Sequence, residues 1–129
     1  MPTERRALDH VLVSQVGKPE EEIAAWWKGR FEQIAAIPMP SARAGALVPE
    51  WRELADLPEP QRLALTRARV LAFDRLSREQ QDRVLEAQDI GSKMTPDIAA
   101  ADMTFIREKV VPGLPGDLAA RVRSPVDRR

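Results

Sequence analysis

The sequence contains no cysteine and only one histidine, His10, among its 129 residues. Without cysteine the chain can form no disulfide, thiolate metal site or thiol nucleophile. One histidine cannot build a multi-histidine metal or redox site within one subunit, which leaves axial ligation by His10 at a subunit interface as a residual alternative. The acidic residues stand at helix starts or at helix-surface spacing, so we expect no metal and no cofactor.

A net charge is also missing, because twenty lysine and arginine residues balance twenty aspartate and glutamate residues. The chain has no overall field to draw it to a phosphate backbone, so nucleic acid is not an expected partner. The longest uncharged run, residues 33–42, has ten residues, whereas a membrane-spanning helix needs roughly 20 apolar ones. We expect no membrane span, no secretory signal and a cytoplasmic location.

Proline, in contrast, is frequent, and the eleven prolines divide the chain into helix-sized intervals rich in alanine, leucine, glutamate, arginine and glutamine. Strand-like alternation of apolar and polar residues is almost absent. The sequence therefore predicts an all-α fold, a small bundle or array of about four to six short helices. We expect a single helical domain over residues 1–121 and a flexible basic tail over residues 122–129.

In the first part of the chain, capping residues predict a helix from Thr3 to Val16 with Gly17 as its left-handed terminator. A second helix is predicted from Pro19 to Ile37, with an acidic first turn that complements the helix dipole. Residues 38–49 show no repeatable period and predict a long proline-rich connector. A short helix around Pro49–Leu54 is expected to follow it.

In the second part, an apolar residue followed by proline, serine or threonine recurs at intervals of 18 to 20 residues. Each instance resembles the start of a helix with a hydrophobic staple, and Ser77 and Gln80 match a capping box. These starts predict helices near residues 60–75, 78–92 and 96–110, with a last turn near 116–122.

The faces of these helices indicate their places in the fold. The helix 61–76 is apolar around most of its circumference, which is typical of a central helix. Arg62 and Arg69 interrupt that surface, so each needs a carboxylate partner or a route to water. A row of alternating charges on the helix 78–93 predicts a peripheral position. Ile98, Ala101 and Phe105 predict a buried stripe on the helix that follows.

The strongest apolar stripe lies on the helix 19–37, which carries two adjacent tryptophans. Adjacent side chains point about 100° apart on a helix, so both are buried only if two surfaces cover that helix. One surface can belong to a partner, or the connector and the Trp51 segment can fold over it within the subunit. The candidate partner-binding residues are Trp26, Trp27, Phe31, Ile34 and Trp51.

No catalytic signature, glycine-rich phosphate loop or metal-ligand spacing occurs in the sequence, so the chain is not expected to be an enzyme. The function we expect is a non-catalytic helical accessory subunit or protein–protein interaction module that binds a protein partner or associates with itself. One alternative is a small nucleic-acid-binding regulator that uses the arginine-rich second half and tail. A ligand- or cofactor-binding helical bundle is the third.

Overall fold

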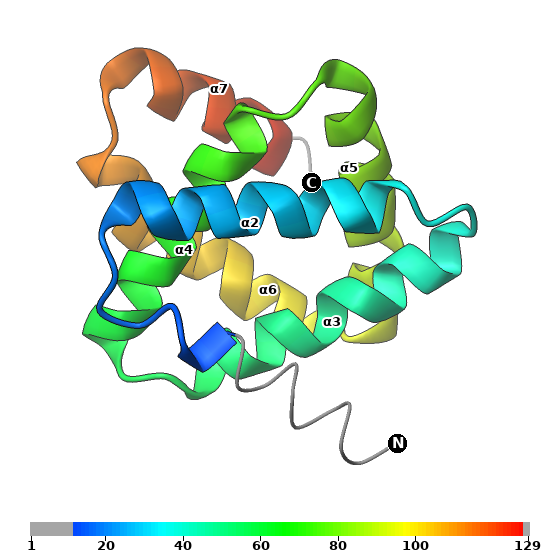
Figure 1. Ribbon diagram of the computed structural model, residues 1–129, viewed down its shortest axis with the longest axis horizontal. Helices are drawn as coiled ribbons and strands as arrows, with labels where there is room; N and C mark the ends of the chain where they lie inside the picture. Colours follow the sequence, from blue (N-terminus) through cyan, green and yellow to red (C-terminus); the bar gives the residue numbers. More distant parts are fainter. Residues whose placement is uncertain (1–11, 128–129) are drawn as a thin grey trace.

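The computed structural model describes the backbone of residues 12–127 and the side chains of residues 12–122. This part of the chain is helical and contains no strand (Figure 1), which confirms the predicted all-α bundle. The helices are α2 (Glu20–Ala35), α3 (Pro40–Asp56), α4 (Glu59–Asp74), α5 (Arg78–Met94), α6 (Pro96–Phe105) and α7 (Gly116–Asp127), with the π-helical turn η1 (Ile106–Val110) and the 3-10 turn η2 (Val111–Gly113) between α6 and α7.

The helix predicted over Thr3–Val16 lies mostly outside the described residues, as does His10. The left-handed conformation predicted for Gly17 is confirmed by its φ of +86°, which glycine adopts without steric cost, but the described helix ends at Val13 and a turn leads from it to Gly17. The capping box at the start of α5 is confirmed as well. The Ser77 hydroxyl accepts a hydrogen bond from the Gln80 backbone N–H at 3.2 Å, and the Gln80 side chain accepts one from the Ser77 N–H at 3.1 Å.

The long connector predicted over residues 38–49 is wrong, because α3 begins at Pro40 and continues through Pro49 to Asp56. The connector was predicted because residues 38–49 show no repeatable apolar period, and Pro49, which has no N–H to donate to the carbonyl four residues earlier, lies inside the helix. The buried apolar side chains of α3 recur at helical spacing and supply the packing that keeps the helix continuous. They are Ala44, Leu47, Val48, Trp51 and Leu54.

Two further expectations are corrected at the C-terminal end of the chain. Ala101 is exposed, whereas Ala99 and Asp102 are the buried residues of α6. The helix is turned in this way because Asp102 pairs with the buried Arg69 of α4 at 2.7 Å. The last helix is also longer than expected: α7 continues to Asp127, past residue 122 where the tail was expected to begin. The mobility of the tail remains a prediction.

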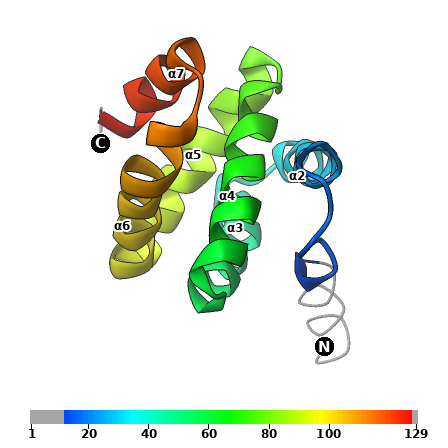
Figure 2. The same cartoon turned by 90° about the vertical axis from the view of Figure 1, so that its left-hand side faces the viewer.

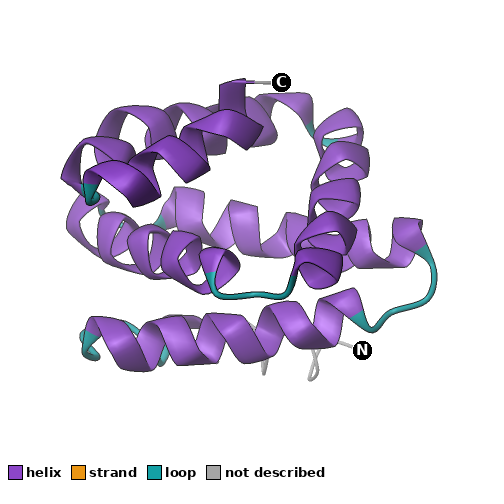
Figure 3. Cartoon of the chain, turned by 90° about the horizontal axis from the view of Figure 1, so that it is seen from above, coloured by secondary structure: helices purple, strands orange, loops and turns teal. Residues whose placement is uncertain are grey.

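α4 occupies the centre of the bundle, as its apolar circumference predicts. In Figure 2, α2 lies on one side of α4, and α6 and α7 lie on the other. Leu65, Ala68 and Ala72 of α4 belong to the main core with the aromatic side chains of α2 and α3. Val70 of the same helix belongs to a second, smaller core with Leu114 and other residues of the C-terminal part. The connections between the helices are short (Figure 3).

The predicted peripheral position of α5 also fits the structure, because all five members of its charged row are exposed. They are Arg78, Asp82, Glu86, Asp89 and Lys93.

Within the described residues, no helix combines the length and the apolar character needed to cross a membrane.

Candidate functional site

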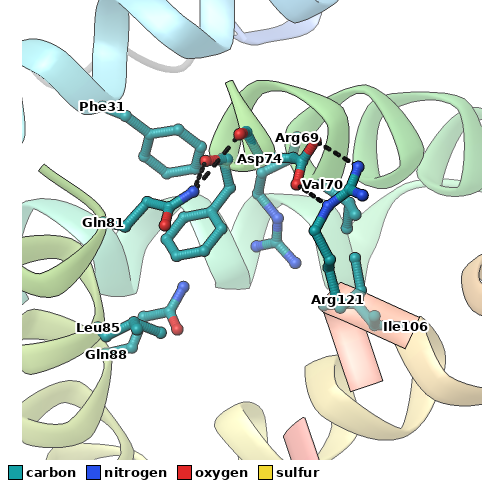
Figure 4. A pocket seen from close by; sticks show the side chains of 11 residues that line it. Phe31, Arg69, Val70, Asp74, Gln81, Leu85, Gln88, Ile106 and Arg121 are labelled. Carbon is teal, nitrogen blue, oxygen red and sulfur yellow. Dashed lines mark hydrogen bonds and ion pairs between the residues drawn. The ribbon is translucent and has the colours of Figure 1, made fainter. Parts of the chain in front are cut away.

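A partly open pocket of about 210 Å³ lies where α4, α5, η1 and α7 meet, with one aromatic ring of α2 in its wall (Figure 4). Most of its wall is apolar and comes from Phe31, Val70, Phe73, Leu85, Ile106 and Val122. The polar groups that line it belong to Arg69, Asp74, Gln81, Gln88 and Arg121. The pocket lies beside the contact between the two hydrophobic cores, because Phe31 belongs to the first and Val70 to the second.

The spacing of residues along α5 turns one of its faces into the pocket. Gln81, Leu85 and Gln88 are four and three residues apart, so they follow one another along one side of the helix. The charged row of α5 occupies the adjoining, exposed face, opposite the buried residues Val84, Ala87 and Gly91. The pocket face of α5 therefore combines one apolar side chain with two neutral amides.

The wall formed by α7 is held against α4 by a two-point ion pair. Arg121 donates hydrogen bonds from Nε and one Nη to the two carboxylate oxygens of Asp74, at 2.9 and 3.1 Å. These hydrogen bonds raise the pKa of Arg121, so its guanidinium stays charged. Both side chains are partly in solvent, which makes this pair a positioning contact more than a source of stability.

Arg69 is the buried cation of the site, with a side chain only 8% exposed. Its Nη2 atom donates to Asp102 Oδ1 at 2.7 Å, which provides the carboxylate partner that the sequence requires for this residue. Arg62 also interrupts the apolar surface of α4. Its guanidinium carbon lies 4.3 Å from the centre of the Phe105 ring. The attraction between the guanidinium and the aromatic ring explains how this helix accommodates the charge of Arg62.

The two glutamine side chains of the site have different environments. The Gln81 amide nitrogen donates to the Phe73 carbonyl at 2.9 Å and so caps the end of α4. Among the described residues, nothing hydrogen-bonds to the side-chain amide of Gln88, and Figure 4 shows this amide turned into the pocket. Gln88 thus offers both donors and an acceptor to whatever occupies the space.

A second buried polar group lies deeper, at Glu50 of α3. Its Oε1 accepts a hydrogen bond from Arg30 Nε at 3.0 Å, whereas Oε2 has no partner among the described residues. Burial raises the pKa of Glu50 above its ordinary value, although the nearby Arg30 and Arg69 oppose that shift. Glu50 does not line the pocket.

The five predicted partner-binding residues come together in one cluster, mainly inside the subunit. Trp27, Phe31, Ile34 and Trp51 are all buried in the main core, while Trp26 is partly exposed and packs against that core. The Trp26 and Trp27 rings meet edge to face with their centres 4.8 Å apart. Trp27 and Trp51 belong to the same buried core, which is compatible with the internal alternative considered from the sequence.

The arginine-rich second half does not present a row of unpaired cations in the described residues. Most of its basic side chains have a carboxylate within 4 Å. These are Arg67, Arg69, Arg75, Arg83, Lys109 and Arg121. Such pairing gives no support to the nucleic-acid alternative, which needs a contiguous basic face.

The sequence analysis missed most of the residues that line the pocket. It identified Arg69 as a cation in need of a partner and Phe31 as part of an apolar stripe, but it assigned neither to a cavity. The available signal was the spacing of Gln81, Leu85 and Gln88, which puts two amides beside a leucine on the inner face of a charged helix.

The described part of the chain holds no cluster of three histidine, cysteine, aspartate or glutamate residues that could bind a metal ion. Comparison with protein families, with curated proteins and with solved structures found no match to this chain. The pocket is therefore the feature of the molecule from which a function can be proposed.

Proposed function

We propose that this protein is a non-catalytic binding module whose ligand is a small molecule held in the pocket between α4, α5, η1 and α7. The observation that carries the proposal is the pocket, which combines apolar walls with a few convergent polar groups. That combination is typical of small-molecule sites in helical bundles. Of the roles considered from the sequence, this corresponds to the ligand-binding bundle.

The volume of the pocket limits the size of its ligand. An engineered, apolar protein cavity of about 150 Å³ binds benzene, and sites for drug-sized ligands reach about 300–1,000 Å³. A pocket of about 210 Å³ lies between these two values. It suits one aromatic ring or one branched aliphatic group with a short substituent.

A neutral aromatic probe tests this proposal without assuming any polar contact. Toluene should raise the melting temperature of the wild-type protein, because a ligand that binds only the folded state stabilises it. Leu85→Trp should abolish this response, since the larger ring occupies the pocket. Met94→Trp is the matched control: it introduces the same side chain on the same helix, at an exposed position outside the pocket.

The proposal is contradicted if toluene has no effect on the wild-type protein at concentrations near its solubility. It is equally contradicted if Leu85→Trp and Met94→Trp respond to toluene in the same way, because binding would then take place elsewhere. Circular dichroism of both variants before the titration verifies that each remains helical.

The expected role as a protein–protein interaction module remains a second candidate, supported by Trp26. This side chain is partly exposed on the outer side of α2, next to the buried Trp27. Tryptophan is over-represented among residues that anchor interfaces. The other four residues proposed for this role could reach a partner only if the subunit core opened.

Sedimentation of the wild-type protein and of Trp26→Ala decides between a partner contact and an internal role for this side chain. If Trp26 mediates self-association, the variant should be less associated while its melting curve stays close to that of the wild type. A lower melting temperature with unchanged association would assign Trp26 to the core alone. Trp27→Ala serves as the comparison for a fully buried tryptophan.

A further inference from the structure

The geometry points to a specific class of ligand for this pocket, a small aromatic or branched-chain carboxylate whose acid group is bound by Arg69 and Gln88. This inference rests on the proposed binding function and adds the chemistry of the ligand to it. Three features support it: the unused donors of a buried guanidinium, the unpaired amide that faces the same space, and the apolar walls of the pocket.

Arg69 has more hydrogen-bond donors than the protein uses. A guanidinium carries five N–H donors, and only the bond from Nη2 to Asp102 is present among the described residues. The side chain is more than nine-tenths buried and lines the pocket. Figure 4 shows its guanidinium reaching into the space between the α5 side chains and Arg121. The remaining donors of Arg69 are therefore available to an acceptor that enters the pocket.

A carboxylate is the acceptor that matches this donor set best. Arginine binds carboxylates through parallel N–H···O bonds, and a bond between charged partners is roughly twice as strong as a neutral one. The Gln88 amide nitrogen can donate to the same group, because its amide turns into the same space. Removal from water strengthens both interactions.

The charged groups of the site are present as two ion pairs. Two of the lining side chains, Arg69 and Arg121, are positive, and one, Asp74, is negative. Asp74 is already bound to Arg121 through both of its oxygens. Asp102, which pairs with Arg69, is not part of the lining. Both lining cations therefore have a carboxylate partner, and an anion in the pocket would meet the unused N–H donors of Arg69, not an excess of positive charge.

The walls determine the rest of the molecule. Phe31, Phe73 and Leu85 surround the space with aromatic and branched groups, so the body of the ligand should be apolar. The volume accepts a ring with a short acid chain but no second ring of that size. Fatty acids with long chains and nucleotides are too large for this site.

The test compares an acid with its neutral analogue. Calorimetric titration at pH 7 with 3-phenylpropionate and with 3-phenylpropionamide measures the contribution of the charge while the ring stays the same. The acid should bind the wild-type protein at least tenfold more tightly than the amide. The double variant Arg69→Met/Asp102→Leu, which removes the buried pair together, should lose this preference. Arg78→Met, which removes an exposed cation outside the pocket, should keep it.

A second variant keeps the test informative if the double variant does not fold. Gln88→Met preserves the length of the side chain and removes its amide, and it should weaken binding of the acid several-fold. If the acid preference is unchanged in every folded variant of Arg69 and Gln88, the assignment of these two residues is wrong.

The outcomes also separate this inference from the proposed function. Equal binding of acid and amide, blocked by Leu85→Trp, would overturn the carboxylate inference and leave the binding pocket standing. Failure of both compounds to bind while toluene binds would have the same meaning. Failure of toluene as well would overturn the proposed function.

Discussion

The close approach of α3 to α5 makes a strong prediction about Gly91. A Cβ atom placed on Gly91 would lie 3.0 Å from two atoms of the Trp51 ring and 3.3 Å from a methyl group of Val48. Trp51 is only 4% exposed, so its ring has little room to move away. We therefore expect Gly91→Ala to push the two helices apart or to force the indole into a poorer rotamer.

The size of the effect can be isolated with a second glycine. Gly29 lies inside α2, and a Cβ atom there would meet nothing within 4 Å. Gly29→Ala should therefore stabilise the protein by about 0.5–1 kcal/mol, the usual gain from replacing glycine within a helix. Gly91→Ala brings a similar gain in helix propensity, but the overpacking against Trp51 and Val48 costs about 1–3 kcal/mol. The two variants should thus differ in stability by about 1–3 kcal/mol.

Urea unfolding followed by far-ultraviolet circular dichroism measures both changes. A double-mutant cycle with Trp51→Phe identifies the cause, because phenylalanine lacks the outer ring atoms of the indole that meet the new Cβ. In that background Gly91→Ala should cost less than in the wild type. If Gly91→Ala stabilises the protein as much as Gly29→Ala does, α3 and α5 are not packed as closely as described.

Three further predictions concern the polar contacts of the fold. Ser77→Ala should lower the unfolding free energy by about 1 kcal/mol through loss of the α5 cap, whereas Ser77→Gly should cost only a few tenths; thermal melts would contradict this if both were neutral. Arg69→Met should cost about 3–5 kcal/mol because it leaves Asp102 buried without a partner, and the addition of Asp102→Leu should recover much of the loss; additive costs in urea unfolding would refute the coupling. Burial raises the pKa of Glu50 above its ordinary value of 4.5. The contribution of Glu50 to the free energy of unfolding is therefore complete below pH 4.5, and it is lost as the pH rises through the pKa of the folded state. The stability of Glu50→Gln relative to the wild type should therefore increase between pH 4.5 and pH 7, and a constant difference would remove the basis for this pKa shift.

The helix starts could be predicted from the sequence because they depend on local chemistry. The serine and glutamine of the α5 capping box, and the proline at the start of α6, act within one turn of their own helix. The central position of α4 followed from its apolar circumference, which is also a local property.

The errors arose where tertiary contacts outweigh local preference. Pro49 predicts a break, yet the buried side chains of α3 on both sides of it hold the helix together. In α6 the pattern of apolar residues predicts that Ala101 is buried. The pairing of Asp102 with Arg69 instead turns the face with Ala99 and Asp102 toward the core. Neither partner of such a contact reveals the other in the sequence.

The pocket was beyond sequence reasoning for a similar reason. Its walls come from α2, α4, α5, η1 and α7, and residues as far apart as Phe31 and Val122 meet there. Each of these residues has an ordinary role on its own helix, and only the packing of the helices leaves space between them. From the sequence, Arg69 could be predicted to need either a carboxylate partner or a route to water, and the structure shows the first.

The most direct test of the binding pocket is a nuclear Overhauser measurement between a bound probe and the side chains of the wild-type protein. With 3-phenylpropionate in excess, the ring protons should show cross-peaks to the methyl groups of Val70, Leu85 and Ile106, which line the pocket from three different elements. Cross-peaks confined to exposed side chains such as Met39, or none at all, would contradict the account.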